Sequence, residues 1–408
     1  MNGSEITLTL TDMAHGGLAL GRDLDGRPVF VPYAIPGETV RVRTGQSGKR
    51  SARAELLQVT KPSSDRVQPP CPHFGICGSC HLQHMTYEAQ IAAKQAVVVD
   101  QLERVGKVKR PSVAPIVPAP EPYGYLREAV LFPAKDGGLG YWSPKERRII
   151  PVSECPILHP VLQEALAYLD VDLPELRKLT LRLGDEDELL AALEVDEMEP
   201  PELAVDFPVS VAIVLPDRTA AALIGDPYLI TTVNGRPYRV SPGVVYPAYP
   251  AAAESLTTAV LALADLQSDD TVLQIPGDAG WLTAALAGQA ADVVVIEPNP
   301  DAVADMVVNL DEFDTVAIYE GFEEEVLPDL DLAPDVVIFQ PANGLTEGMW
   351  YGLSRMQPRT LVIIGEIGAV ARDMVGLGEL GYRLVEARPV DFRPQGYEVL
   401  VAVGMTTK

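Results

Sequence analysis

The sequence predicts an α/β protein with a small β-barrel at its start, and three changes of pattern along its 408 residues predict this arrangement. Short apolar–polar alternations separated by glycine and proline turns fill residues 5–60. A stretch rich in proline, cysteine and histidine follows over residues 61–85. From residue 251 onward, helical segments alternate with short apolar runs, as in a doubly wound parallel sheet. We therefore expect three domains, with bounds at 1–62, 63–245 and 246–408.

The first domain is predicted from strands and turns. Ile6–Leu10 alternates in the way that a half-buried strand does, and Val29–Val31 and Val40–Val42 continue the pattern. About five strands in this length favour a small barrel of the OB type. The turns are marked by Gly16-Gly17, Asp25-Gly26 and Pro36-Gly37.

The middle domain is predicted to be a mixture of strands and short helices. The pattern becomes helical from Tyr87 to Val105, and this helix could pack on the C-terminal domain. Residues 120–245 indicate mainly strands, including a predicted pair formed by Gly138–Tyr141 and Arg148–Val152.

The C-terminal domain is predicted from alternating helices and buried strands. Helices are expected over Ala251–Ala264, over Ala279–Ala287 and through Met306. The first five strands should be parallel with helices on both faces, and the last two should form an antiparallel pair at the edge. The expected strands are Thr271–Ile275, Asp292–Ile296, Thr315–Tyr319, Asp335–Phe339, Thr360–Ile364, Tyr382–Ala387 and Tyr397–Val403.

Charge is unevenly distributed along the chain, whose net charge is −25. Residues 1–110 carry 14 Lys and Arg against 10 Asp and Glu, whereas the remaining 298 residues carry 18 against 47. Because basic side chains release counterions when they bind a polyanion, nucleic acid should meet the N-terminal part first. The acidity of the rest argues against a broad nucleic-acid surface there, although it is equally consistent with a role in solubility.

The sequence predicts neither a membrane protein nor a secreted one. No run reaches about 18 uninterrupted apolar residues, and the first residues lack the basic and apolar regions of a signal peptide. We expect a cytoplasmic protein, in which clustered thiols are more often metal ligands than disulfides.

The four cysteines of the chain predict one metal site. Cys71, Cys77 and Cys80 follow one another closely, and Cys155 precedes a proline much later. Four thiolates complete either a zinc site or an iron–sulfur cluster. Zinc sites usually take two C-x2-C pairs, whereas only one is present here, so the spacing favours a cluster. A mixed zinc site is the alternative, because His73, His81, His84 and His159 lie nearby in sequence.

These motifs carry a resemblance. Residues 67–94 read VQPPCPHFGICGSCHLQHMTYEAQIAAK, between Phe30–Pro32 with Ile35–Glu38 upstream and Tyr125–Arg127 with Cys155–Pro160 downstream. Together they resemble the bacterial TRAM-domain RNA uracil-5-methyltransferases that bind a [4Fe-4S] cluster and modify 23S ribosomal RNA. The resemblance implies an OB-like TRAM barrel that binds RNA, a cluster held by the four cysteines, and a Rossmann-like C-terminal domain that binds S-adenosylmethionine.

The resemblance also shows where catalytic residues should lie. Enzymes of that family add a cysteine thiolate to carbon 6 of uracil, and a glutamate later removes the proton from carbon 5. Matching Ala371–Asp373 to the family's Ala-Arg-Asp helix puts Gly365 at the nucleophile position. Matching Pro394-Gln395 puts Leu400 at the base position. Neither side chain can do this chemistry, so the sequence predicts no catalytic residue for C5 methylation.

The cofactor positions are altered as well. The family's glycine-rich loop aligns with Gln274–Gly280, where Asp278 brings a carboxylate towards the expected place of the methionyl carboxylate. Of the expected contacts with S-adenosylmethionine, Gly280 and Glu297 remain. Glu297 ends the second strand, where an acidic residue would bind the ribose; alternatively, it is a carboxylate that faces water. S-adenosylmethionine binding is therefore in question.

Few other residues after His159 could supply acid–base chemistry, because that part contains neither histidine nor cysteine. Tyr397 with Glu398, or Glu366, could serve, but nothing near them in sequence forms a site. For RNA, basic residues alternate around the loop at Gly45–Gly48, and phosphate contact competes with the interpretation of a solvated face. These residues are Arg41, Arg43, Lys49, Arg50 and Arg53.

We interpret the chain as a degenerate relative of these uracil-5-methyltransferases that binds RNA, most naturally ribosomal RNA, and carries a [4Fe-4S] cluster without C5 chemistry. The first alternative is an active S-adenosylmethionine-dependent RNA methyltransferase with an altered pocket or target. The second is an interaction scaffold whose partner is an active paralogue or a ribosomal protein.

Overall fold

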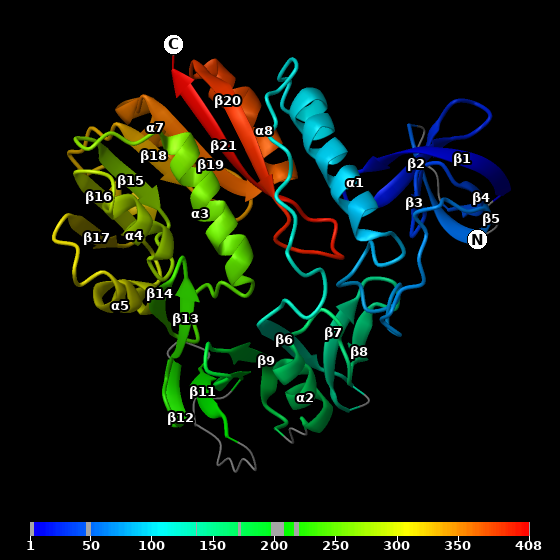
Figure 1. The fold of residues 1–408 in the computed structure, drawn as a ribbon, viewed down its shortest axis with the longest axis horizontal. Coiled ribbons are helices and arrows are strands. Elements are labelled where there is room, and N and C mark those ends of the chain that lie inside the picture. The colour runs from blue at the N-terminus through cyan, green and yellow to red at the C-terminus, as the bar shows by residue number, and fades with distance from the viewer. Residues whose placement is uncertain are drawn as a thin grey trace.

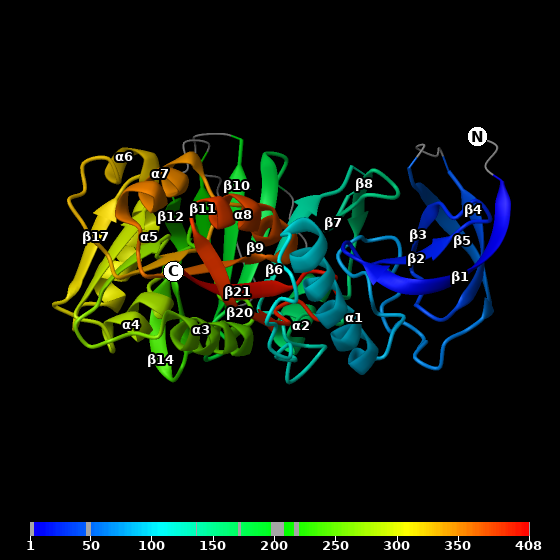
Figure 2. The ribbon, with the colours of Figure 1, turned by 90° about the horizontal axis from the view of Figure 1, so that it is seen from above.

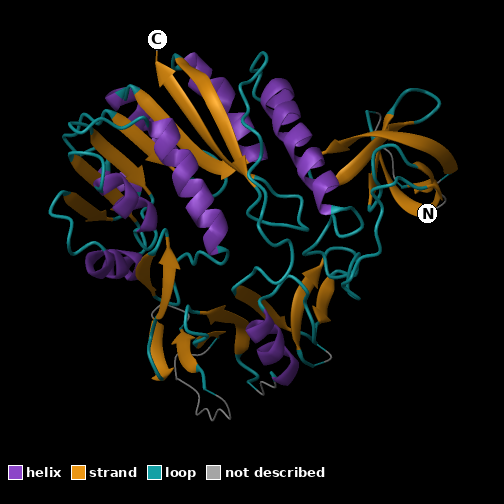
Figure 3. Ribbon diagram, in the orientation of Figure 1, coloured by secondary structure: helices purple, strands orange, loops and turns teal. Residues whose placement is uncertain are grey.

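The computed structural model describes residues 4–45, 50–135, 137–169, 173–196, 208–215 and 220–407. The N-terminal barrel and the C-terminal sheet lie at opposite ends of the molecule, and the middle region joins them from below (Figure 1). Seen from above, the barrel again projects at one end (Figure 2). Helix α1 (Tyr87–Asp100) stands between the barrel and the C-terminal sheet (Figure 3).

The first five strands close into a barrel in the order β1-β2-β3-β5-β4, which confirms the predicted N-terminal fold. Strands β3 and β5 run parallel, and the other neighbours are antiparallel. Every second residue of β4 is buried, so the alternation in the sequence corresponds to the inside and outside of the barrel. The strands are β1 (Glu5–Ala14), β2 (Leu18–Arg22), β3 (Pro28–Pro32), β4 (Thr39–Thr44) and β5 (Ala52–Lys61).

The middle region contains a seven-stranded sheet in the order β12-β11-β10-β9-β6-β7-β8 and a separate two-stranded hairpin. The expected pair near residues 138–152 is present as β7 and β8. Helix α2 (Pro160–Tyr168) packs on β9. The strands are β6 (Glu128–Pro133), β7 (Leu139–Ser143), β8 (Arg148–Pro151), β9 (Leu176–Leu183), β10 (Leu189–Val195), β11 (Ser210–Val214) and β12 (Ala220–Ile224), with the hairpin β13 (Leu229–Val233) and β14 (Arg236–Val240).

The C-terminal domain is a seven-stranded sheet in the order β17-β16-β15-β18-β19-β21-β20. The first five strands along the chain are parallel, and β20 and β21 are antiparallel at one edge, as the sequence predicts. The strands are β15 (Thr271–Ile275), β16 (Asp292–Glu297), β17 (Val316–Glu320), β18 (Val336–Phe339), β19 (Thr360–Glu366), β20 (Tyr382–Val390) and β21 (Leu400–Thr407).

Two apolar cores cover the two faces of this sheet, because successive strand residues point to opposite sides. In β18, Val336 and Ile338 belong to one core, and Val337 and Phe339 belong to the other. The first core includes helices α3 (Pro250–Ala264), α4 (Trp281–Ala287) and α5 (Pro300–Asn309). The second includes residues of α1, of the π-helical turn η1 (Gln101–Val105), and of the helices α7 (Glu347–Met356) and α8 (Ile367–Glu379), with the short α6 (Glu323–Val326) beside α7.

Helix α1 therefore packs on the C-terminal domain, and a buried polar network joins the two. Lys94 Nζ lies 2.6 Å from an Asp391 carboxylate oxygen, and the Tyr87 hydroxyl donates to the other oxygen at 2.8 Å. The side chains of Gln90 and Gln395 are also hydrogen-bonded. These contacts involve residues before β21, and they explain why the strand predicted at Tyr397–Val403 begins only at Leu400.

Within the described residues, no helix combines the length and the apolar character that crossing a membrane requires.

Candidate functional site

The four cysteines come together from two segments far apart in sequence. Each of the six possible pairs among Cys71, Cys77, Cys80 and Cys155 interacts electrostatically. Burial, with the neighbouring thiols, raises the pKa of Cys80 to about 12 and that of Cys155 to about 11. Because four thiols share this small volume without a cation beside them, a bound cationic group would stabilise their ionised forms.

The arrangement of these thiols does not match a single ion. Among the described residues, no group of three or more His, Cys, Asp or Glu side chains is placed to hold a metal ion. A tetrahedral zinc site would need all its sulfurs about 2.3 Å from one point. A cluster of several irons separates its terminal thiolates more widely, so the composition of the donor set, four thiols, fits an iron–sulfur cluster better than zinc.

The histidines of the mixed zinc alternative are engaged elsewhere. His84 lies 3.4 Å from the carbonyl oxygen of Ala34 in the barrel, and burial lowers its pKa to about 4. Nδ1 of His159 accepts a hydrogen bond from the backbone of Val161 and caps helix α2. His81 packs edge-on against Tyr397.

The carboxyl ends of the parallel strands form the edge where a doubly wound sheet usually binds its ligand. Glu297 ends β16 there, but it does not face water, because it is only 3% exposed. Its carboxylate accepts hydrogen bonds from the backbone N–H groups of Gly277, Asp278 and Asn299, at 2.9–3.0 Å. The water-facing alternative for Glu297 is therefore wrong, and its oxygens already hold the loop after β15.

Asp278 sits in that loop with a left-handed backbone conformation, φ 51°. Such a φ favours glycine and is tolerated by aspartate, which explains why a glycine-rich motif can carry a carboxylate here. Burial and the neighbouring Glu297 raise the pKa of Asp278 to about 7. Burial likewise raises the pKa of Glu297 against its backbone hydrogen bonds.

These residues do not fit S-adenosylmethionine well. Two carboxyl groups adjoin in the loop that would receive the anionic methionyl end of the cofactor, and like charges repel. Gly280 donates its N–H to the carbonyl of Gly277. A Cβ at Gly280 would meet Leu310 and Met306 at 3.1–3.2 Å, so close packing against the end of α5 accounts for this glycine.

The two positions predicted from the resemblance as nucleophile and base lie side by side. Gly365 is the penultimate residue of β19 and pairs with Val401 of β21, next to Leu400. A Cβ at Gly365 would lie 3.0 Å from Cγ2 of Val370, so a larger side chain would have to displace its neighbour. The four thiols of the chain all lie before residue 156, in the cysteine cluster.

One group of residues at this edge was missed by the sequence analysis as a site. His15 of the β1–β2 turn and His81 of the cysteine loop both pack edge-on against Tyr397, with ring centroids 5.7 and 4.7 Å away. Glu366 lies 3.5 Å from His15, and Glu398 acts electrostatically on His81. We call these five residues the junction cluster, because they join the barrel, the cysteine loop and the C-terminal sheet.

The junction cluster contains buried polar atoms without hydrogen bonds within the described residues. They are Nδ1 of His15 and of His81, Oε1 of Glu366 and Oε2 of Glu398. Burial lowers the pKa of His81, although Glu398 opposes the shift. Two imidazoles and two carboxylates could exchange protons with a ligand. The one signal in the sequence was that the chain has only five histidines, and two of them meet here.

The predicted RNA contacts of the barrel separate into different environments. Arg41 and Arg50 are exposed, whereas Arg43 is exposed but pairs with Glu5 and Glu55 at 3.1 and 3.5 Å. Arg53 is exposed and, within the described residues, forms no ion pair. Lys49 lies outside the described residues.

Comparison with known proteins agrees with this architecture. Residues 1–57 match the TRAM domain model. Over 95% of this chain and 94% of the other, the sequence is 28% identical to an uncharacterized RNA methyltransferase of Halalkalibacterium halodurans. It is 29% identical to an uncharacterized RNA methyltransferase of Streptomyces coelicolor, over 96% of this chain and 90% of the other.

Among solved structures, the fold resembles the Pyrococcus abyssi tRNA (uracil-54, C5)-methyltransferase in complex with S-adenosyl-L-homocysteine. The TM-score is 0.73 at 20% identity, covering 98% of this chain and 100% of the other. The chain thus has a TRAM barrel and a methyltransferase-type Rossmann-like sheet, and it is similar along nearly its whole length to proteins named as RNA methyltransferases.

Proposed function

We propose that this protein binds RNA, most naturally ribosomal RNA, on the architecture of an RNA uracil-5-methyltransferase, without methylating carbon 5 of uracil. One observation carries the proposal: the adjacent strand positions that should provide a nucleophile and a base hold Gly365 and Leu400. Neither side chain can add to a pyrimidine or take up a proton. The TRAM domain and the similarity to RNA methyltransferases support RNA as the partner.

We further propose that Cys71, Cys77, Cys80 and Cys155 hold a [4Fe-4S] cluster with a structural role. Their mutual proximity and the raised pKa values of Cys71, Cys80 and Cys155 support it, because iron would neutralise thiolates that otherwise repel one another. When bound, the group would provide a covalent link between the loop at residues 71–80 and the turn at Cys155. A cytoplasmic location, where thiols stay reduced, suits this assignment.

An active S-adenosylmethionine-dependent RNA methyltransferase with a different target is the second candidate. The junction cluster favours it, because His15 and His81 bring acid–base groups to the sheet edge from outside the C-terminal domain. Transfer to a nitrogen or a hydroxyl would not require a thiolate.

Calorimetric titration of the purified, cluster-loaded protein with S-adenosylmethionine separates these candidates. The proposal predicts no saturable heat, because the loop after β15 carries Asp278 beside Glu297. Binding in the micromolar range, about −8 kcal/mol, would favour the active enzyme instead. Cross-linking of the N-terminal region to RNA tests the other half, since a scaffold that binds only protein would give no direct cross-links there.

A further inference from the structure

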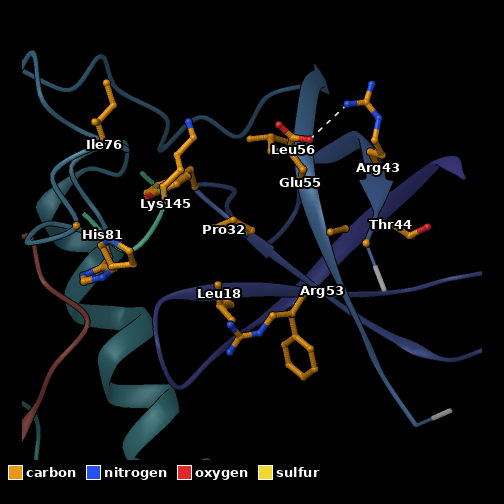
Figure 4. A pocket seen from close by; sticks show the side chains of 16 residues that line it. Leu18, Pro32, Arg43, Thr44, Arg53, Glu55, Leu56, Ile76, His81 and Lys145 are labelled. Atoms are coloured by element: carbon orange, nitrogen blue, oxygen red, sulfur yellow. Dashed lines mark hydrogen bonds and ion pairs between the residues drawn. The ribbon is translucent and has the colours of Figure 1, made fainter. Parts of the chain in front are cut away.

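A cavity of about 940 Å³ lies between the outside of the barrel and the cysteine loop. This volume is near the upper end of the range of about 300–1,000 Å³ that is typical of cavities for small ligands. Barrel strands β2, β3, β4 and β5 form one wall, and the cysteine loop and the turn after β7 form the other (Figure 4). The junction cluster adjoins it, because His81 lines the cavity.

The floor of this cavity is apolar and partly aromatic. Phe30 lies on β3, directly opposite Arg53 of β5. Tyr33 follows β3 and packs edge-on against Phe74 of the cysteine loop, with ring centroids 5.2 Å apart. Other apolar lining residues are Leu18, Pro32, Leu56 and Ile76.

The charges around the cavity are not equivalent. Arg43 is neutralised by Glu55, which also lines the cavity, and by Glu5 (Figure 4). Arg53 and Lys145 line it from opposite walls, both are exposed, and neither forms an ion pair within the described residues. Two unpaired cations therefore flank an apolar floor.

We propose that this cavity binds a short stretch of unpaired RNA, with bases against Phe30 and Tyr33 and with phosphates at Arg53 and Lys145. The inference rests on the proposed RNA binding and specifies both its place and the form of the RNA. Aromatic faces bind unstacked bases, and nearby cations bind the backbone between them.

A duplex fits this surface less well, because its bases are stacked on one another and it offers mainly phosphates and ribose hydroxyls. An acidic peptide could use Arg53 and Lys145, but its carboxylate side chains would leave the apolar floor without a partner. The combination of ring faces and unpaired cations in one cavity therefore favours single-stranded RNA.

The test is the affinity of the full-length, cluster-loaded protein for a labelled single-stranded RNA of about 12 nucleotides, within the usual site sizes of about 4–16. Fluorescence anisotropy is measured at several salt concentrations. The double variant Arg53→Ala/Lys145→Ala should raise Kd at least about tenfold and flatten the salt dependence by about 0.7 for each lost phosphate contact. The variant Phe30→Leu should raise Kd roughly 5- to 150-fold, with little change in the salt dependence.

The matched control is Arg41→Ala/Arg50→Ala, which removes the same charge from the same domain, at positions that do not line the cavity. It should change Kd much less than the cavity variant. Equal effects of the two double variants would overturn the cavity assignment, as would equal affinity for a duplex of the same length or effective competition by polyglutamate. If the wild-type protein binds no RNA at all, the proposed function itself fails, which is a different result.

Discussion

The cysteine cluster and the carboxyl edge of the C-terminal sheet both gather polar groups from distant parts of the chain, but they leave these groups in opposite states. At the cysteine cluster, four thiols interact with one another and have no cationic partner. At the sheet edge, Glu297 is fully engaged by backbone N–H groups, and Gly365 and Leu400 carry no reactive atom. The fold of an enzyme can therefore persist where its own hydrogen bonds and apolar contacts have taken over the positions of the chemistry.

The largest expected effect concerns the thiols. An anaerobic preparation should be brown, with about four irons per chain, and Cys155→Ser should lose most of that iron because one of four ligands is gone. Iron analysis and the visible absorption spectrum measure both. A colourless protein with one zinc per chain would contradict the cluster, and it would make the two regions more alike than we propose.

Next in size is the loss of Lys94, which links α1 to the segment before β21. Lys94→Met leaves Asp391 buried without its cation, so the free energy of unfolding should fall by about 3–5 kcal/mol in urea denaturation. The double variant Lys94→Met/Asp391→Leu is the control and should recover a large part of the loss, because no unpaired charge remains. Equal losses in both variants would mean that packing, not the charge, is responsible.

A smaller effect, dependent on pH, is expected at Asp278. Its folded pKa of about 7 lies above its ordinary value of 3.8, so the stability that its protonated form contributes is present below about pH 3.8 and lost as the pH rises through 7. Asp278→Asn should raise the free energy of unfolding by about 2–4 kcal/mol at pH 8 and by less at pH 5. Chemical denaturation at both pH values measures the difference. A gain that is the same at pH 5 and pH 8 would show that Asp278 does not titrate in this range.

The smallest expected effect concerns the nucleophile position. Gly365→Cys should lower stability by about 1–3 kcal/mol, because the new Cβ approaches Val370. The double variant Gly365→Cys/Leu400→Glu should still make no 5-methyluridine, since the loop with Asp278 is unchanged. Appearance of the product would mean that only these two side chains separate the chain from an active enzyme.

Much of the fold was predictable, because periodicity reports burial. The alternation in residues 5–60 gave the barrel, and the apolar runs after residue 270 gave five parallel strands. The strand predicted from Tyr397 began later, because long-range hydrogen bonds hold residues such as Gln395 against α1 and the cysteine loop.

The site was less predictable than the fold. The spacing of the cysteines brought attention to four thiols that do lie together. The junction cluster could not be found in the same way, because His15 and His81 reach Tyr397 only through the packing of the barrel and the cysteine loop on the C-terminal domain. Nor does the sequence tell that Glu297 is consumed by backbone N–H groups, since its position at a strand end is the same in either case.

The most direct measurement is nucleoside mass spectrometry of an unmodified ribosomal RNA transcript after incubation with the purified, cluster-loaded protein and S-adenosylmethionine. With Gly365 and Leu400 at the critical positions, the protein should produce no 5-methyluridine above a control without protein. Formation of 5-methyluridine in proportion to protein and time would contradict the central claim.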